Sequence, residues 1–120
     1  MASQFEVSAG KAIGYTTGGA VTQLTSKSTG VTLNQPSGQI TTHNAQLVGG
    51  SEISFTVTCD KVSATDVVAV CISSGADSTN YITSISAVAA GSFDVTISNL
   101  GSSASEALVL NYVVFKASAS

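Results

Sequence analysis

Residues 52–59 read Glu-Ile-Ser-Phe-Thr-Val-Thr-Cys, and every second side chain in this stretch is apolar. Because successive side chains of a β-strand point to opposite faces, this period of two predicts a strand with one buried face. Residues 92–98, Ser-Phe-Asp-Val-Thr-Ile-Ser, repeat the pattern. The two stretches predict a protein built from half-buried β-strands.

Two further stretches are apolar on both faces. Residues 66–72, DVVAVCI, are almost continuously apolar and β-branched, so we expect a strand that is covered on both sides and runs through the middle of a sheet. Residues 107–116, ALVLNYVVFK, predict a central strand or a strand at an interface. Shorter or less regular strands are expected at residues 20–24, 31–34, 39–43 and 81–88.

Turn-forming residues separate these strands. Clusters of Gly, Pro, Asn, Asp and Ser recur at intervals of roughly ten to fifteen residues, and no stretch has the period of an amphipathic helix. About eight short strands at this spacing predict an all-β fold, an antiparallel β-sandwich that is jelly-roll-like. The chain of 120 residues fits one domain, which we place at residues 12–117, with an N-terminal arm at 1–11 and a C-terminal tail at 118–120.

The composition restricts the function classes. Charged residues make up 9% of the chain, so its surface must be largely neutral, and such a surface meets a partner without the cost of desolvating ions. The four cations are lysines dispersed along a chain of net charge −3, which argues against nucleic-acid binding. The sequence shows neither an apolar run of membrane-spanning length nor a secretory signal pattern, so we expect no membrane span and synthesis in a cytoplasm.

Few side chains suggest catalysis. His43 is the single histidine, and a hydrolase would need it beside a nucleophile such as Ser37 or Thr41. The sequence has no Gly-x-Ser-x-Gly elbow, so we interpret His43 as a polar turn or interface residue. We predict no enzymatic activity, no catalytic residue and no cofactor.

Acids and cysteines suggest structural roles. Asp60, Asp66 and Asp77 lack the spacing of a calcium-binding loop, so no metal site is predicted; the first and last are expected to form turns, and Asp66 to be an edge charge. Cys59 and Cys71 are expected to be two buried, reduced thiols. If their strands formed a hairpin, the sulfurs would lie about five residues out of register, too far for a disulfide.

Five segments carry a family resemblance: AVTQLTSKSTGVTLN (20–34), SFTVT (54–58), ATDVV (64–68), AAGSF (89–93) and SEALVLN (105–111). They resemble small virion proteins of tailed bacteriophages, over roughly residues 12–117. The resemblance implies a head decoration, or cement, protein: a β-sandwich on the capsid exterior that bridges subunits of the major capsid protein. It also implies a homo-oligomer, with a trimer favoured over a dimer.

The candidate interface residues are Phe5 and Val7 in the arm, Tyr15, and Val109, Val113 and Phe115 near the C-terminus. For the last three, completion of the core is the preferred interpretation, and a homotypic interface is the other. The alternative function is a receptor- or glycan-binding module of a tail fibre or spike. Tyr15 and Tyr81 exposed together at one rim would favour that alternative.

Overall fold

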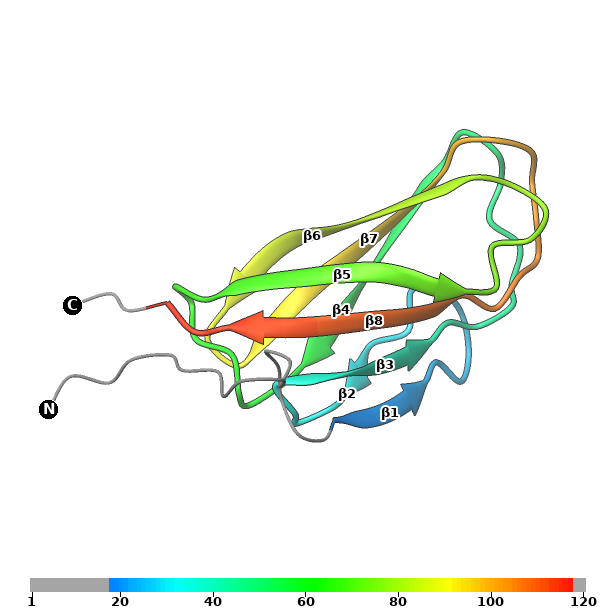
Figure 1. The fold of residues 1–120 in the computed structure, drawn as a ribbon. Helices are drawn as coiled ribbons and strands as arrows, with labels where there is room; N and C mark the ends of the chain where they lie inside the picture. Colours follow the sequence, from blue (N-terminus) through cyan, green and yellow to red (C-terminus); the bar gives the residue numbers. More distant parts are fainter. Residues whose placement is uncertain (1–17, 118–120) are drawn as a thin grey trace, which may run out of the picture.

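The computed structural model describes residues 18–117, which form eight β-strands and no helix. The strands make two four-stranded sheets that pack together as a sandwich (Figure 1). Their bounds are β1 (Gly19–Thr22), β2 (Val31–Thr32), β3 (Ser37–Thr41), β4 (Glu52–Thr58), β5 (Val67–Ser74), β6 (Tyr81–Ala89), β7 (Ser92–Asn99) and β8 (Val109–Phe115). The all-β sandwich with about eight strands is confirmed, whereas the predicted arm and tail lie outside the described residues.

The two sheets have the strand orders β1-β3-β8-β5 and β2-β4-β7-β6. Pairs β3/β8, β5/β8, β4/β7 and β6/β7 are antiparallel, but β1/β3 and β2/β4 are parallel. The expectation of purely antiparallel sheets is therefore wrong for two pairs. In the first sheet the reason is that the chain leaves β1, crosses to the other sheet to form β2, and returns in the original direction as β3. The strand order does not confirm a jelly roll.

The core fills the space between the sheets. In the second sheet, Phe55 and Val57 of β4 lie opposite Val95 and Phe93 of β7, and all four are buried. β8 supplies the facing layer, which consists of Leu110, Tyr112 and Val114. The two layers meet directly, since the rings of Phe93 and Tyr112 have centroids 5.2 Å apart.

β5 is an edge strand and not a central one. It pairs with β8 alone among the described strands, and every second side chain near its start is exposed. The prediction from residues 66–72 was wrong because a strand with an apolar outer surface has the same sequence pattern as a strand covered on both faces. The central strand is β8, one of the two alternatives expected for residues 107–116.

β3 begins earlier than the sequence predicts. The strand was expected at residues 39–43, but the pairing with β8 starts before residue 39: Val114 donates its amide hydrogen to the carbonyl of Pro36 at 2.7 Å, and Ser37 lies opposite Val113. Gly38 faces the core, where an added Cβ would come within 2.6 Å of Leu33. Glycine at this position therefore provides space for packing inside a strand.

Candidate docking surface

The register of the first sheet determines which side chains of β5 and β8 face outward. Val67 lies opposite Phe115, and Ala69 opposite Val113. The intervening residue Val68 is buried, so these four side chains point away from the core. They form, together with Cys71, what we call the apolar patch: Val67, Ala69, Cys71, Val113 and Phe115.

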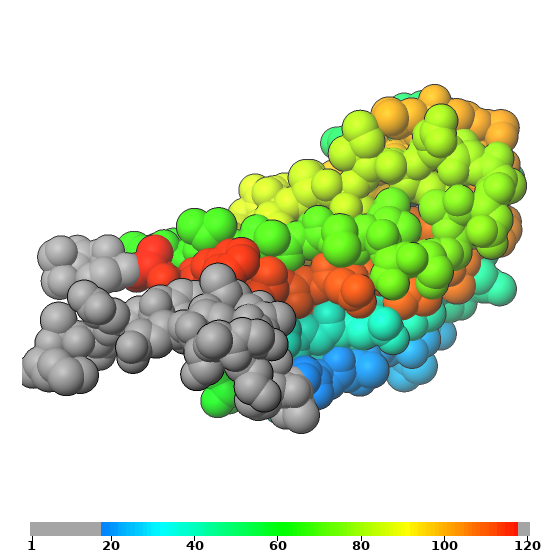
Figure 2. All heavy atoms as spheres, viewed as in Figure 1, coloured from blue at the N-terminus to red at the C-terminus, as the bar shows by residue number. Residues whose placement is uncertain are grey.

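The apolar patch is open to solvent. Val67 is 58% exposed and Phe115 is 49% exposed, and Ala69 and Cys71 are also exposed. A shallow depression of ≈ 200 Å³ lies between the strands, with Ala69, Cys71 and Val113 among its lining residues. Figure 2 shows β5 and β8 side by side on the near surface of the molecule. Exposed apolar side chains gathered in this way mark interaction sites on soluble proteins.

The outward-facing side chains of the described strands of the first sheet are all uncharged. Beyond the apolar patch, β3 and β1 present small polar or apolar side chains, and Gln39 donates a 3.4 Å hydrogen bond to Asn111. The outward positions of the four strands are Ala20, Thr22, Ser37, Gln39, Thr41, Val67, Ala69, Cys71, Val109, Asn111, Val113 and Phe115. A partner can therefore cover this face without desolvating an ion.

The nearest charges to the apolar patch neutralise each other. Lys116 follows Phe115 and lies 2.5 Å from the carboxylate of Asp66, which also accepts hydrogen bonds from the amides of Ser63 and Ala117. The bond from Lys116, followed by that from Ser63, holds the pKa of Asp66 below its ordinary value. The expected edge charge is thus a buried, paired carboxylate that ties the end of β8 to the loop before β5.

The outer face of the second sheet has a different chemistry. Ser54 and Thr96 share a 2.7 Å hydrogen bond between their hydroxyls, Thr96 donates to Ser86 at 2.9 Å, and Thr56 donates to Asp94 at 2.7 Å. These groups satisfy one another across the strands. Of the two outer faces, the one formed by β5 and β8 therefore gains more from being covered.

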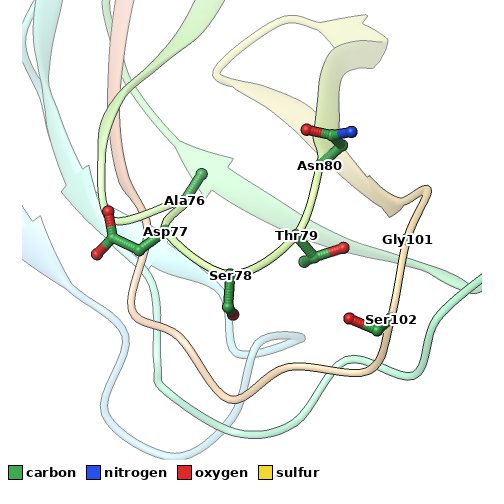
Figure 3. A pocket seen from close by; sticks show the side chains of 7 residues that line it. All are labelled: Ala76, Asp77, Ser78, Thr79, Asn80, Gly101 and Ser102. Atoms are coloured by element: carbon green, nitrogen blue, oxygen red, sulfur yellow. The ribbon is translucent and has the colours of Figure 1, made fainter.

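A polar depression lies at one end of the sandwich, between the loops that hold residues 76–80 and 101–102 (Figure 3). Asn99 lies beneath it: its side chain donates to the carbonyls of Leu47 and Ser102 and accepts from Thr79 and Gly101, at 2.9–3.0 Å. These four hydrogen bonds use the whole capacity of one buried amide. The depression is thus built on a fixed base, but no aromatic ring from residues 18–117 lines it.

Glu106 fixes the same end from the other side. Its carboxylate accepts hydrogen bonds from the amides of Asp77 and Ser78 and from the hydroxyl of Tyr81. Burial raises the pKa of Glu106, but the hydrogen bonds, led by that of Asp77, outweigh it and keep the pKa below its ordinary value. Burial and the bond to Glu106 together raise the pKa of Tyr81 to about 12. The half-buried Tyr81 therefore serves the fold and does not offer an exposed ring.

Lys27 is buried at the loops that precede β2. Its ammonium group donates to the carbonyls of His43 and Glu106, and Gln23 bonds to the carbonyls of Lys27 and Thr29. Burial lowers the pKa of Lys27, and the nearby charge of Glu106 opposes this effect. No sequence pattern indicates this network, because a lysine among serines and threonines has the pattern of a solvated loop.

His43, Asp60 and Asp77 each take part in hydrogen bonds of the loops that hold them. The ring of His43 accepts a 3.0 Å hydrogen bond from the amide of Ala45, which agrees with the predicted turn role. The amides of Asp60 and Asp77 donate to Asn34 and Glu106 rather than to their own side chains. No group of three or more His, Cys, Asp or Glu side chains in this part of the chain could hold a metal ion.

Both cysteines are free, but only Cys59 is buried. The expectation of a buried Cys71 was wrong because its strand is an edge and its side chain points outward. The hairpin considered for the two strands does not form, since β4 and β5 belong to different sheets.

The structure brings part of the predicted interface together. Val113 and Phe115 lie on the outer face and within the apolar patch, and Val109 lies further along the same face. Their preferred placement in the core was wrong, because the core-facing residues of β8 are the alternate ones. Phe5, Val7 and Tyr15 lie outside the described residues. Sequence reasoning missed Val67, Ala69 and Cys71, whose exposure depends on β5 being an edge.

Comparisons with protein-family models, with curated proteins and with solved structures found no match. The described part of the chain contains no helix that is long and apolar enough to cross a membrane.

Proposed function

We propose that this protein is a structural virion protein, a head decoration protein that binds the outside of a phage head and bridges subunits of the major capsid protein. The observation that carries the proposal is the apolar patch on an uncharged sheet face, with Val67 58% exposed and Phe115 49% exposed. The resemblance of the sequence to small virion proteins of tailed phages supplies the identity of the partner. The chain acts by adhesion and stays on the capsid exterior.

A small contact surface on each copy is sufficient for this function. A protein that is repeated over a shell gains binding strength from many copies, so each contact can be small. The described side chains offer such a contact through β5 and β8, and the hydroxyls of the second sheet are suited to face water.

The test is co-sedimentation of the purified chain with expanded, genome-free shells assembled from the major capsid protein of the phage that carries this chain. The double variant Val67→Ser/Phe115→Ser should bind at least about tenfold more weakly, because it removes two exposed apolar contacts. The matched control is Ile82→Ser/Leu100→Ser, since these residues are 55% and 59% exposed but lie on other surfaces. Unchanged binding of the first variant, or equal loss in the control, would refute the proposal.

The alternative is a receptor- or glycan-binding module of a tail fibre or spike. The polar depression favours it, because hydroxyl and amide side chains such as Ser78, Asn80 and Ser102 line it (Figure 3). The orientation of Tyr81 disfavours it, since its hydroxyl is bound to Glu106. Glycan binding that is lost in Asn80→Ala, with no binding to shells, would replace the first proposal by this one.

A further inference from the structure

The described chain enters the first sheet close to the apolar patch. Gly18 lies against β3, where a Cβ added to it would come within 2.5 Å of the carbonyl oxygen of Ser37. Ser37 lies opposite Val113, and Val113 lies opposite Ala69, so this row of the sheet leads directly to two members of the patch. Three strand spacings of about 4.8 Å, or about 14 Å in all, therefore separate Gly18 from Ala69.

The strand β1 begins at the end of the sheet that carries the two large side chains of the apolar patch. β1 runs parallel to β3, and β8 runs antiparallel to β3, so β1 starts at the end where β8 finishes (Figure 1). Val67 and Phe115 lie opposite each other at this same end, and both are exposed. Residues 1–17 are therefore joined to the sheet on the side where the patch offers most apolar surface.

The sequence of residues 1–17, MASQFEVSAGKAIGYTT, suits this surface in composition and in length. Only two of the seventeen side chains are charged, and Phe5 and Val7 are spaced so that an extended backbone places both on one side. Val7 precedes Gly18 by eleven residues, which span up to about 36 Å at roughly 3.3 Å per residue. This reach is more than twice the distance to Ala69, so Phe5 and Val7 can contact any part of the patch.

Covalent attachment favours this segment over every other apolar occupant. A group joined to its site by a short length of chain has an effective concentration on the order of millimolar. A separate protein with equal apolar contacts would have to reach a similar concentration to compete. A shell can still displace the segment, because it offers many copies of its contact at once.

We propose that residues 1–17 fold back over the apolar patch of their own chain, with Phe5 and Val7 against it, and that a shell displaces them on binding. The segment is thus an intramolecular cover, which protects the isolated protein from aggregation through the patch. It also lowers the affinity for the shell by the free energy needed to remove it. The displacement rests on the proposed function, whereas the cover is tested without shells.

The first experiment detects the cover by disulfide trapping in the full chain. Under mild oxidation, Val7→Cys should form an intramolecular disulfide with Cys71, which is exposed within the patch. Cys59 does not compete, because it is 0% exposed. Mass spectrometry of the monomer from a non-reducing gel measures the yield. Adding Val67→Ser/Phe115→Ser to the same chain should lower the yield by about fivefold or more, because the apolar contacts that hold the segment are lost.

The matched control moves the second thiol to Thr58, which is exposed at the end of β4 on the outer face of the second sheet. Thr58 is also close to the start of β1: its carbonyl accepts a 2.9 Å hydrogen bond from Leu33, whose side chain lies beside Gly19. Val7→Cys/Cys71→Ser/Thr58→Cys should give at least about fivefold less disulfide, because contact with the patch alone concentrates the two thiols. An equal yield in this control, or a disulfide that only links two chains, overturns the proposal.

The second experiment measures the displacement with the genome-free shells described above. Phe5→Ser/Val7→Ser should bind shells at least about threefold more tightly than the wild-type chain, because a weakened cover competes less well for the patch. Equal or weaker binding of this variant overturns the displacement. If neither chain binds shells, the proposed function fails, and the disulfide yields still decide whether the segment covers the patch.

Discussion

Replacement of Asn99 by alanine should cost about 3 kcal/mol of folding free energy. The side chain is 1% exposed and makes four hydrogen bonds of 2.9–3.0 Å, to Leu47, Ser102, Thr79 and Gly101. A typical internal hydrogen bond contributes about 1 kcal/mol net. The total falls below four times this value because Gly101 and Ser102 are exposed and water can replace their lost partner.

The assay is urea unfolding followed by circular dichroism, with thermal melts as a second measure. For a domain of this size, a loss of about 3 kcal/mol corresponds to a fall in Tm of roughly 12–24 °C. Asn111→Ala is the matched control: Asn111 is exposed and has one 3.4 Å contact, so its loss should stay within about 0.5 kcal/mol. A cost below about 1 kcal/mol for Asn99→Ala, or a similar cost for the control, would refute the reasoning.

Two further predictions concern buried charges. Lys116 lowers the pKa of Asp66 in the folded state, so the ionised carboxylate stabilises the fold at pH values above its ordinary pKa of 3.8, and this stabilisation is lost as the pH falls through the lower pKa of the folded state. In thermal melts from neutral to acidic pH, Asp66→Asn should lose this acid dependence of Tm. An unchanged pH profile would contradict the assignment. Lys27→Met should destabilise the fold by about 2 kcal/mol, since the carbonyls of His43 and Glu106 lose their donor. Urea unfolding measures this change. A variant of equal or greater stability would show that the two hydrogen bonds of Lys27 do not offset the cost of burying its ammonium group.

The strands with strict alternation were predictable because one physical cause sets their pattern. In β4 and β7, apolar side chains face the core and polar ones face water, so residues 52–59 and 92–98 identify both the strand and its buried face. For β5 and β8 the alternation is absent, since the outer face is apolar as well. The sequence pattern alone does not distinguish an apolar side chain that packs against the other sheet from one that is exposed on the outer face.

The amino-acid sequence alone determined the class of fold, because period-two patterns and turn residues depend only on neighbours along the chain. Only the tertiary structure decided that β5 is an edge, that Val113 and Phe115 face outward, and that Lys27 and Asp66 are buried. These properties depend on which strands lie side by side. That choice is made by contacts between residues far apart in sequence, such as Asp66 with Lys116 and Lys27 with Glu106.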